Sequence, residues 1–125
     1  VTYNVPVENT DHARGAIRTA LEIQEQLHTH DFSAVGRMRT RVGINSGHVI
    51  AGSVGAYDRL NYTVHGDAVN VAARLEQLNK QFGTTGLVSE ETKALARDDN
   101  AIRYTRMGSL PIRGKSEEVS VYSVE

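Results

Sequence analysis

The sequence of 125 residues has no cysteine and no tryptophan, and only two prolines and two phenylalanines. Without cysteine there are no disulfide bonds and no thiolate metal sites. No apolar run approaches the length of a membrane-spanning helix or of the hydrophobic segment of a secretory signal. These absences favour a cytoplasmic domain.

Neither sign of charge predominates in the sequence. Fourteen Lys and Arg residues stand against 15 Asp and Glu residues, for a net charge of -1. Bulk charge therefore argues against a nucleic-acid or membrane-surface partner, and any anion site must be formed locally. Hydrophobic residues make up 39% and charged residues 23%, which is typical of a soluble globular domain and not of disorder, collagen or a coiled coil.

Hydrophobic periodicity predicts helices interspersed with strands. Apolar residues at helical spacing predict one amphipathic helix from Asp11 to about His28 and a second from Ala68 to about Lys80, and Ser89 is a candidate N-cap for a shorter helix. Alternating or short apolar runs predict the strands, at residues 38–45, 48–51, 60–64, 85–88, about 102–106 and 118–124. The order of the elements predicts helices packed on a sheet.

The segment after Gly66 carries the most informative polar residues. Asn70 and Arg74 are four residues apart on the predicted second helix, so they share one face beside its apolar stripe. An amide beside a guanidinium suits a sugar oxygen beside a phosphate. The alternative is an ordinary solvated helix face, and the spacing alone favours that alternative because such pairs are common.

Two other cations lie beside glycines. Arg41 lies on the polar face of a predicted strand with Gly43, whose missing side chain would let a ligand approach the backbone, and Lys115 follows Gly114. Each alone is typical of a surface charge, so only their convergence would form an anion site. The sequence around Lys115 lacks the glycine spacing and the following helix of a P-loop.

Three segments carry a more specific pattern: RVGINSGHVIAG at residues 41–52, YTVHGDAVNVAARL at 62–75, and IRGK at 112–115. Together they resemble the catalytic domain of the class III adenylate/guanylate cyclases, and the resemblance runs from Asn4 to the C-terminus. It implies an α+β, ferredoxin-like cyclase fold, with helices packed on a mainly antiparallel sheet. It also implies a homodimer that binds ATP or GTP between its protomers.

The resemblance assigns roles to five residues of this sequence. Arg74 matches the family's transition-state arginine, and Asn70 matches the asparagine that orients the ribose. Arg41 and Lys115 match cations that contact the triphosphate. Thr63 occupies the purine-selecting position, where many adenylate cyclases carry Asp and a bacterial subgroup, some of it bicarbonate-responsive, carries Thr. A hydroxyl can donate or accept, so it discriminates between the adenine amino group and the guanine carbonyl less decisively than a carboxylate would. We favour ATP over GTP as the substrate.

The family's two Mg²⁺ or Mn²⁺ ions are held by a pair of aspartates that this sequence does not match. We expect those ligands upstream of Val1, with residues 1–125 forming the C-terminal two-thirds of the domain and lacking its first strand, helix and hairpin. The chain alone is therefore predicted to be inactive. In the dimer, Arg41 would serve the half-site opposite the one that contains Thr63, Asn70, Arg74 and Lys115.

The sequence thus predicts an adenylate cyclase, a phosphorus-oxygen lyase that forms 3′,5′-cyclic AMP and pyrophosphate from ATP in intracellular signalling. One alternative is a catalytically incomplete cyclase-like module for nucleotide binding or dimerisation, and another is a plain α/β interaction domain. The presence of Asn70, Arg74 and Lys115 together argues against both. A membrane would be reached only through an attached domain.

Overall fold

The computed structural model describes residues 2–4, 8–29, 40–56, 59–96, 99–111 and 118–125. Within them are three helices: α1 (His12–Thr29), α2 (Asp67–Phe82) and α3 (Glu90–Ala96). The strands among the described residues are β1 (Val42–Ile44), β2 (Ile50–Ala56), β3 (Arg59–His65), β4 (Gly86–Ser89), β5 (Tyr104–Pro111) and β6 (Glu118–Val124). The predicted mixture of helices and strands is confirmed.

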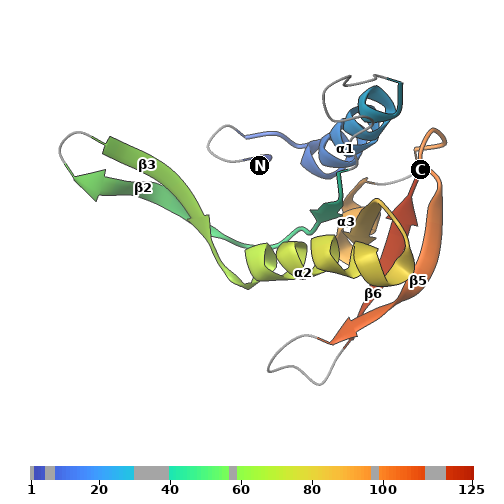
Figure 1. Cartoon of the computed structure of the whole chain (residues 1–125). Coiled ribbons are helices and arrows are strands. Elements are labelled where there is room, and N and C mark those ends of the chain that lie inside the picture. Colours follow the sequence, from blue (N-terminus) through green and yellow to red (C-terminus); the bar gives the residue numbers. More distant parts are fainter. Residues whose placement is uncertain (1, 5–7, 30–39, 57–58, 97–98, 112–117) are drawn as a thin grey trace.

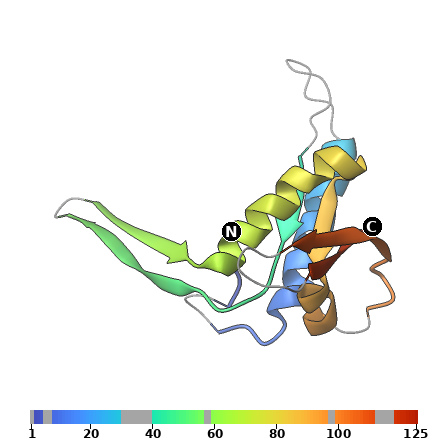
Figure 2. The ribbon, with the colours of Figure 1, turned by 90° about the horizontal axis from the view of Figure 1, so that it is seen from below.

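The main sheet has four strands in the order β1-β4-β6-β5. β1 pairs in parallel with β4, whereas β6 is antiparallel to both of its neighbours. β2 and β3 form a separate antiparallel hairpin that projects away from this sheet and its helices (Figures 1 and 2). Antiparallel pairing therefore predominates, in agreement with the predicted α+β class.

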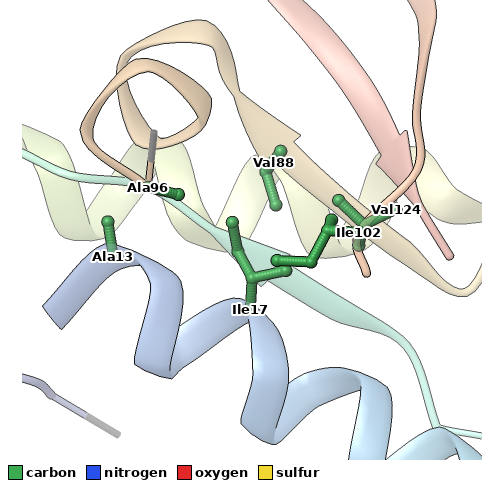
Figure 3. Close-up of a cluster of buried hydrophobic side chains, with 6 residues drawn as sticks. All are labelled: Ala13, Ile17, Val88, Ala96, Ile102 and Val124. Atoms are coloured by element: carbon green, nitrogen blue, oxygen red, sulfur yellow. The ribbon is translucent and has the colours of Figure 1, made fainter. Parts of the chain in front are cut away.

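Helices cover both faces of the main sheet. Two neighbouring residues of β4 show this, because successive side chains of a strand point to opposite faces. Val88 belongs to a buried cluster with residues of α1 and α3, shown in Figure 3. Leu87, the preceding residue, packs instead with Leu75 of α2. The first cluster comprises Ala13, Ile17, Val88, Ala96, Ile102 and Val124, and the second Leu75, Leu87, Leu110 and Val121.

α2 packs unusually closely on β1 at Gly43. A Cβ at this position would collide with the backbone nitrogen of Glu76 and the carbonyl oxygen of Ala72, and would lie 2.9 Å from the carbonyl carbon of Leu75. The prediction that Gly43 leaves room for a ligand is therefore wrong, because the helix backbone fills that space. The glycine positions α2 instead.

A buried amide fixes the same contact. Asn79 is 1% exposed, and its Nδ2 donates to the carbonyl oxygen of Val42 at 3.0 Å and to that of Glu76 at 3.1 Å. Its Oδ1 accepts a hydrogen bond from the Thr84 hydroxyl at 2.8 Å. These bonds satisfy a polar group inside an otherwise apolar interface, so α2 and β1 are joined by directional contacts as well as by packing.

The predicted helices agree with the structure better than some predicted strands. β1 has only three residues and begins after Arg41, whereas the predicted strand began at Met38, outside the described residues. β5 runs from Tyr104 to Pro111, well past the predicted end near Arg106. A register shift between Arg106 and Gly108 interrupts its alternation, and this accounts for the missed extension.

Candidate functional site

α2 begins immediately after β3, at a turn that requires glycine. Gly66 has φ 148°, a conformation that L side chains rarely adopt, and it connects His65 at the end of β3 to Asp67 at the start of α2. Asp67 places a carboxylate in the first helical turn, where the helix dipole favours negative charge. This turn places Asn70 near the N-terminal end of α2.

Asn70 and Arg74 lie together on an exposed strip of α2. Both residues are exposed, and four residues of helix separate them by only about 40° around the axis. Leu75 is fully buried, and Val71 packs partly buried against the same apolar cluster. The predicted position of the pair, beside the apolar stripe and outside it, is confirmed; its chemical role stays a prediction.

Arg74 also contacts the end of the main sheet. Its Nη1 donates to the carbonyl oxygen of Pro111, the last residue of β5, at 3.4 Å. This bond is long, so it restrains the guanidinium only weakly. Lys115 follows Pro111 by four residues in the sequence and lies outside the described residues.

Thr63 lies on the β3 side of the Gly66 turn. Its backbone pairs with Gly52 of β2 in the hairpin register, and its side chain is outside the described part of the structure. Thr63 and Asn70 therefore flank the same turn, one at the end of a strand and the other at the start of a helix.

Arg41 lies on the other side of α2. Its Nε donates to Glu76 Oε1 at 3.3 Å, and the two side chains are 39% and 40% exposed. Glu76 follows Arg74 by two residues, about 200° around the helix axis. The structure thus brings Asn70 and Arg74 together and keeps Arg41 apart from them within one chain.

The described residues do not fit a divalent-metal site. They contain no group of three or more His, Cys, Asp or Glu side chains that could hold a metal ion. Asp67, the acidic residue nearest to Asn70 in the sequence, is exposed in the first turn of α2. No metal ligand is therefore assigned to the part of the chain that the structure describes.

The sequence did not predict that the Asp99 carboxylate pairs with Arg18 of α1. Asp99 has a side chain that is 7% exposed, and it accepts hydrogen bonds from the backbone N–H of Ala101 at 3.0 Å and from Arg18. These contacts hold the pKa of Asp99 below its ordinary value. No local pattern reveals the pair, because Arg18 and Asp99 are 81 positions apart.

Comparison with known proteins decides the family. The family model described as the adenylate and guanylate cyclase catalytic domain matches residues 1–125. The chain belongs to this family. Among curated proteins, this cyclase chain is 40% identical to adenylate cyclase 1 of Rhizobium meliloti (strain 1021) over 126 residues, covering 98% of the chain and 19% of the relative.

A second curated relative is also named an adenylate cyclase. The terminal-differentiation-specific adenylate cyclase of Dictyostelium discoideum is 35% identical to this cyclase chain over 118 residues, which are 90% of the chain and 5% of that protein. The chain thus spans a fifth or less of the length of both relatives.

Solved structures confirm the predicted cyclase fold. A bacterial light-regulated adenylyl cyclase superposes with a TM-score of 0.73 and 27% identity, covering 94% of this chain and 34% of that one. The guanylate cyclase domain of RhGC from Catenaria anguillulae, in complex with GTP, gives a TM-score of 0.79 with 25% identity, covering 98% of this chain and 64% of that one. No helix in the described part of this cyclase chain is both long and apolar enough to cross a membrane.

Proposed function

We propose that this chain is the catalytic part of an adenylate cyclase that forms a cytoplasmic signal from ATP at the interface between two copies. The ribose 3′-oxygen attacks the α-phosphorus, and a new oxygen–phosphorus bond forms as the bond from the α-phosphorus to the pyrophosphate oxygen breaks. The 3′-hydroxyl proton leaves to solvent, and the products are 3′,5′-cyclic AMP and pyrophosphate. The exposed Asn70–Arg74 pair in the N-terminal half of α2, in a chain of this family, carries the proposal.

The side chains on α2 suit this reaction. Asn70 offers a donor and an acceptor for hydroxyl groups of the ribose. Arg74 offers a permanent positive charge, and among the described residues its side chain has a single hydrogen bond, to the carbonyl oxygen of Pro111. Negative charge moves onto the phosphate oxygens and the leaving pyrophosphate in the transition state, so a guanidinium placed there stabilises that state more than the bound substrate.

Arg41 and Lys115 are assigned to the triphosphate. Within one chain Arg41 contacts Glu76, which lies about 200° around α2 from Arg74, and this separation supports a site that is completed by a second copy. A homodimer resolves this, because Arg41 of one protomer then completes the half-site that contains Asn70 and Arg74 of the other. By the family resemblance, Lys115 belongs to the same half-site as Arg74.

The β2–β3 hairpin supports the same assembly. Seven residue pairs join its two strands, and it projects from the main sheet as a sheet of its own (Figure 2). A two-stranded hairpin alone is marginally stable in water, so it gains from packing against another surface. Ile50, at its base, is 78% exposed and adds apolar area that a second copy would cover.

ATP is proposed over GTP as the substrate. Two relatives, 40% and 35% identical over at least 90% of the chain, are named adenylate cyclases. Thr63 is the proposed purine-selecting residue, and its hydroxyl could accept a hydrogen bond from the adenine amino group. Because a similar guanylate cyclase domain was solved with GTP, both nucleotides belong in the assay.

The proposed metal ligands are a pair of aspartates that the family resemblance implies. The family reaction uses Mg²⁺ or Mn²⁺, which neutralises phosphate charge when bound. Because the sequence does not match the family's pair of metal-binding aspartates, we propose that these ligands are encoded upstream of Val1. Residues 1–125 alone are accordingly expected to be inactive.

An assay of two proteins tests the proposal. One protein is residues 1–125 and the other is the same chain extended by the sequence encoded upstream of Val1; each is incubated with ATP or GTP and Mn²⁺. Cyclic AMP is expected from the extended protein only, at a rate per molecule that rises with dimer concentration. If the extended dimer binds ATP but forms no cyclic nucleotide, the chain is a cyclase-like binding module and the proposed activity is wrong.

A further inference from the structure

The Arg41–Glu76 salt bridge joins a proposed triphosphate-binding residue to a residue without an assigned role. Arg41 Nε lies 3.3 Å from Glu76 Oε1, and both side chains are partly exposed. A surface pair of this kind contributes little to folding stability. The salt bridge matters instead for the direction in which it holds the Arg41 guanidinium.

The contact leaves the phosphate-binding end of the arginine available. Glu76 accepts a hydrogen bond from Nε, and among the described residues neither terminal nitrogen of Arg41 has a hydrogen-bond partner. Those terminal N–H groups can donate parallel hydrogen bonds to phosphate oxygens. The carboxylate can therefore orient the guanidinium without occupying the groups that would bind phosphate.

Glu76 is itself held in place. Its backbone nitrogen lies too close to Gly43 to leave room for a Cβ there, and its carbonyl oxygen accepts a hydrogen bond from Asn79 at 3.1 Å. The same Asn79 amide donates to the carbonyl oxygen of Val42. These contacts fix Glu76 against β1, the strand that begins directly after Arg41.

We propose that Glu76 is a positioning residue for Arg41, holding its guanidinium with the terminal N–H groups directed toward the triphosphate in the opposite half-site. The inference rests on the proposed function, because it takes Arg41 to bind triphosphate. Ordering a long side chain before the ligand arrives reduces the conformational entropy lost on binding. The Glu76 carboxylate also repels phosphate, and the experiment must separate that repulsion from the positioning.

Glu76→Asp makes the separation, because it keeps the negative charge and shortens the side chain by one methylene. Tripolyphosphate binding to the purified full chain is measured by isothermal titration calorimetry. Glu76→Asp is expected to weaken binding about three- to tenfold. Glu76→Gln, which keeps the reach and an oxygen acceptor, is expected to bind more tightly than Glu76→Asp. Glu22→Asp, at an exposed position of α1, is the matched control and is expected to bind like wild type.

Two outcomes distinguish this inference from the proposed function. If Arg41→Ala weakens binding but Glu76→Asp binds as tightly as wild type or more tightly, the positioning role is wrong and Glu76 only masks Arg41. If wild type binds no tripolyphosphate, or Arg41→Ala leaves binding unchanged, the assignment of Arg41 to the triphosphate is itself wrong.

A measurement on wild type serves even if a variant does not fold. The NMR signal of the Arg41 Nε–H group should remain protected from solvent exchange when tripolyphosphate is added, because the pair persists while the terminal nitrogens bind. Loss of that protection on binding would mean that phosphate displaces Glu76, which contradicts the positioning role.

Discussion

Replacing Gly43 with alanine should damage the interface between α2 and β1. The added methyl group would overlap the backbone at Ala72 and Glu76 and lie 2.9 Å from the carbonyl carbon of Leu75. Backbone atoms of a packed helix cannot move aside as a flexible side chain can, so α2 must shift. Overpacking of this kind costs about 1–3 kcal/mol.

The shift should also strain a buried hydrogen bond. Asn79 Nδ2 donates to the carbonyl oxygen of Val42 at 3.0 Å, beside the overlap. Weakening a buried bond that leaves its partner unsatisfied costs about 1–3 kcal/mol. Because the two costs overlap, we expect Gly43→Ala to lower the free energy of unfolding by about 2–4 kcal/mol in total.

Urea denaturation followed by circular dichroism measures this change. Gly52→Ala is the matched control, because a Cβ on Gly52 meets no atom within 4 Å. The control should change the free energy of unfolding by less than about 1 kcal/mol. If Gly43→Ala unfolds within about 0.5 kcal/mol of wild type, the close approach of α2 to β1 is not a feature of the folded protein.

Three further predictions concern the site and the surface. Arg74→Ala should lower kcat of the extended protein about 10²- to 10³-fold with little change in KM, whereas Lys80→Ala on the same helix should not; equal changes in kcat and KM would contradict a transition-state role. Thr63→Val should lower the preference for ATP over GTP, measured as the ratio of kcat/KM for the two nucleotides. An unchanged ratio would show that Thr63 does not select the purine. The Ala101 N–H and Arg18 hold the pKa of Asp99 below 3.8, so the stabilisation is present above about pH 4 and is lost as pH falls through the lowered pKa. Asp99→Asn should therefore unfold more easily than wild type at pH 7, by a margin that shrinks at acidic pH; a margin independent of pH would refute it.

The two longer helices could be predicted from sequence because their periodicity follows from the sheet they cover. α2 buries Leu75 and exposes Arg74, the preceding residue, about 100° around the axis. A period of 3.6 residues in the sequence predicts this separation of buried and exposed positions. Asn70 and Arg74 could be placed together for the same reason. Ser89 was correctly expected to cap α3, where its hydroxyl accepts a hydrogen bond from the Thr92 backbone nitrogen at 3.3 Å.

Contacts distant in sequence could not be predicted. The sequence around Gly43 indicates that something approaches closely, but not whether a ligand or a helix does so. Arg41 and Glu76 are 35 positions apart, so their pairing depends on the packing of α2 on β1. Asn79 interrupts the apolar stripe of α2 because its side chain donates a hydrogen bond to the carbonyl oxygen of Val42 in β1, a contact that the sequence does not predict.

The close attachment of α2 to β1 has a consequence for the proposed dimer. Asn70 and Arg74 lie on one side of this helix, and Glu76, which contacts Arg41, lies on the other. In a symmetric dimer each copy of α2 would then contribute to both nucleotide sites at once. A nucleotide that displaces α2 at one site must alter the other, and this linkage is reciprocal. Binding of the first and second nucleotides should therefore be cooperative, with a sign set by the direction of that displacement.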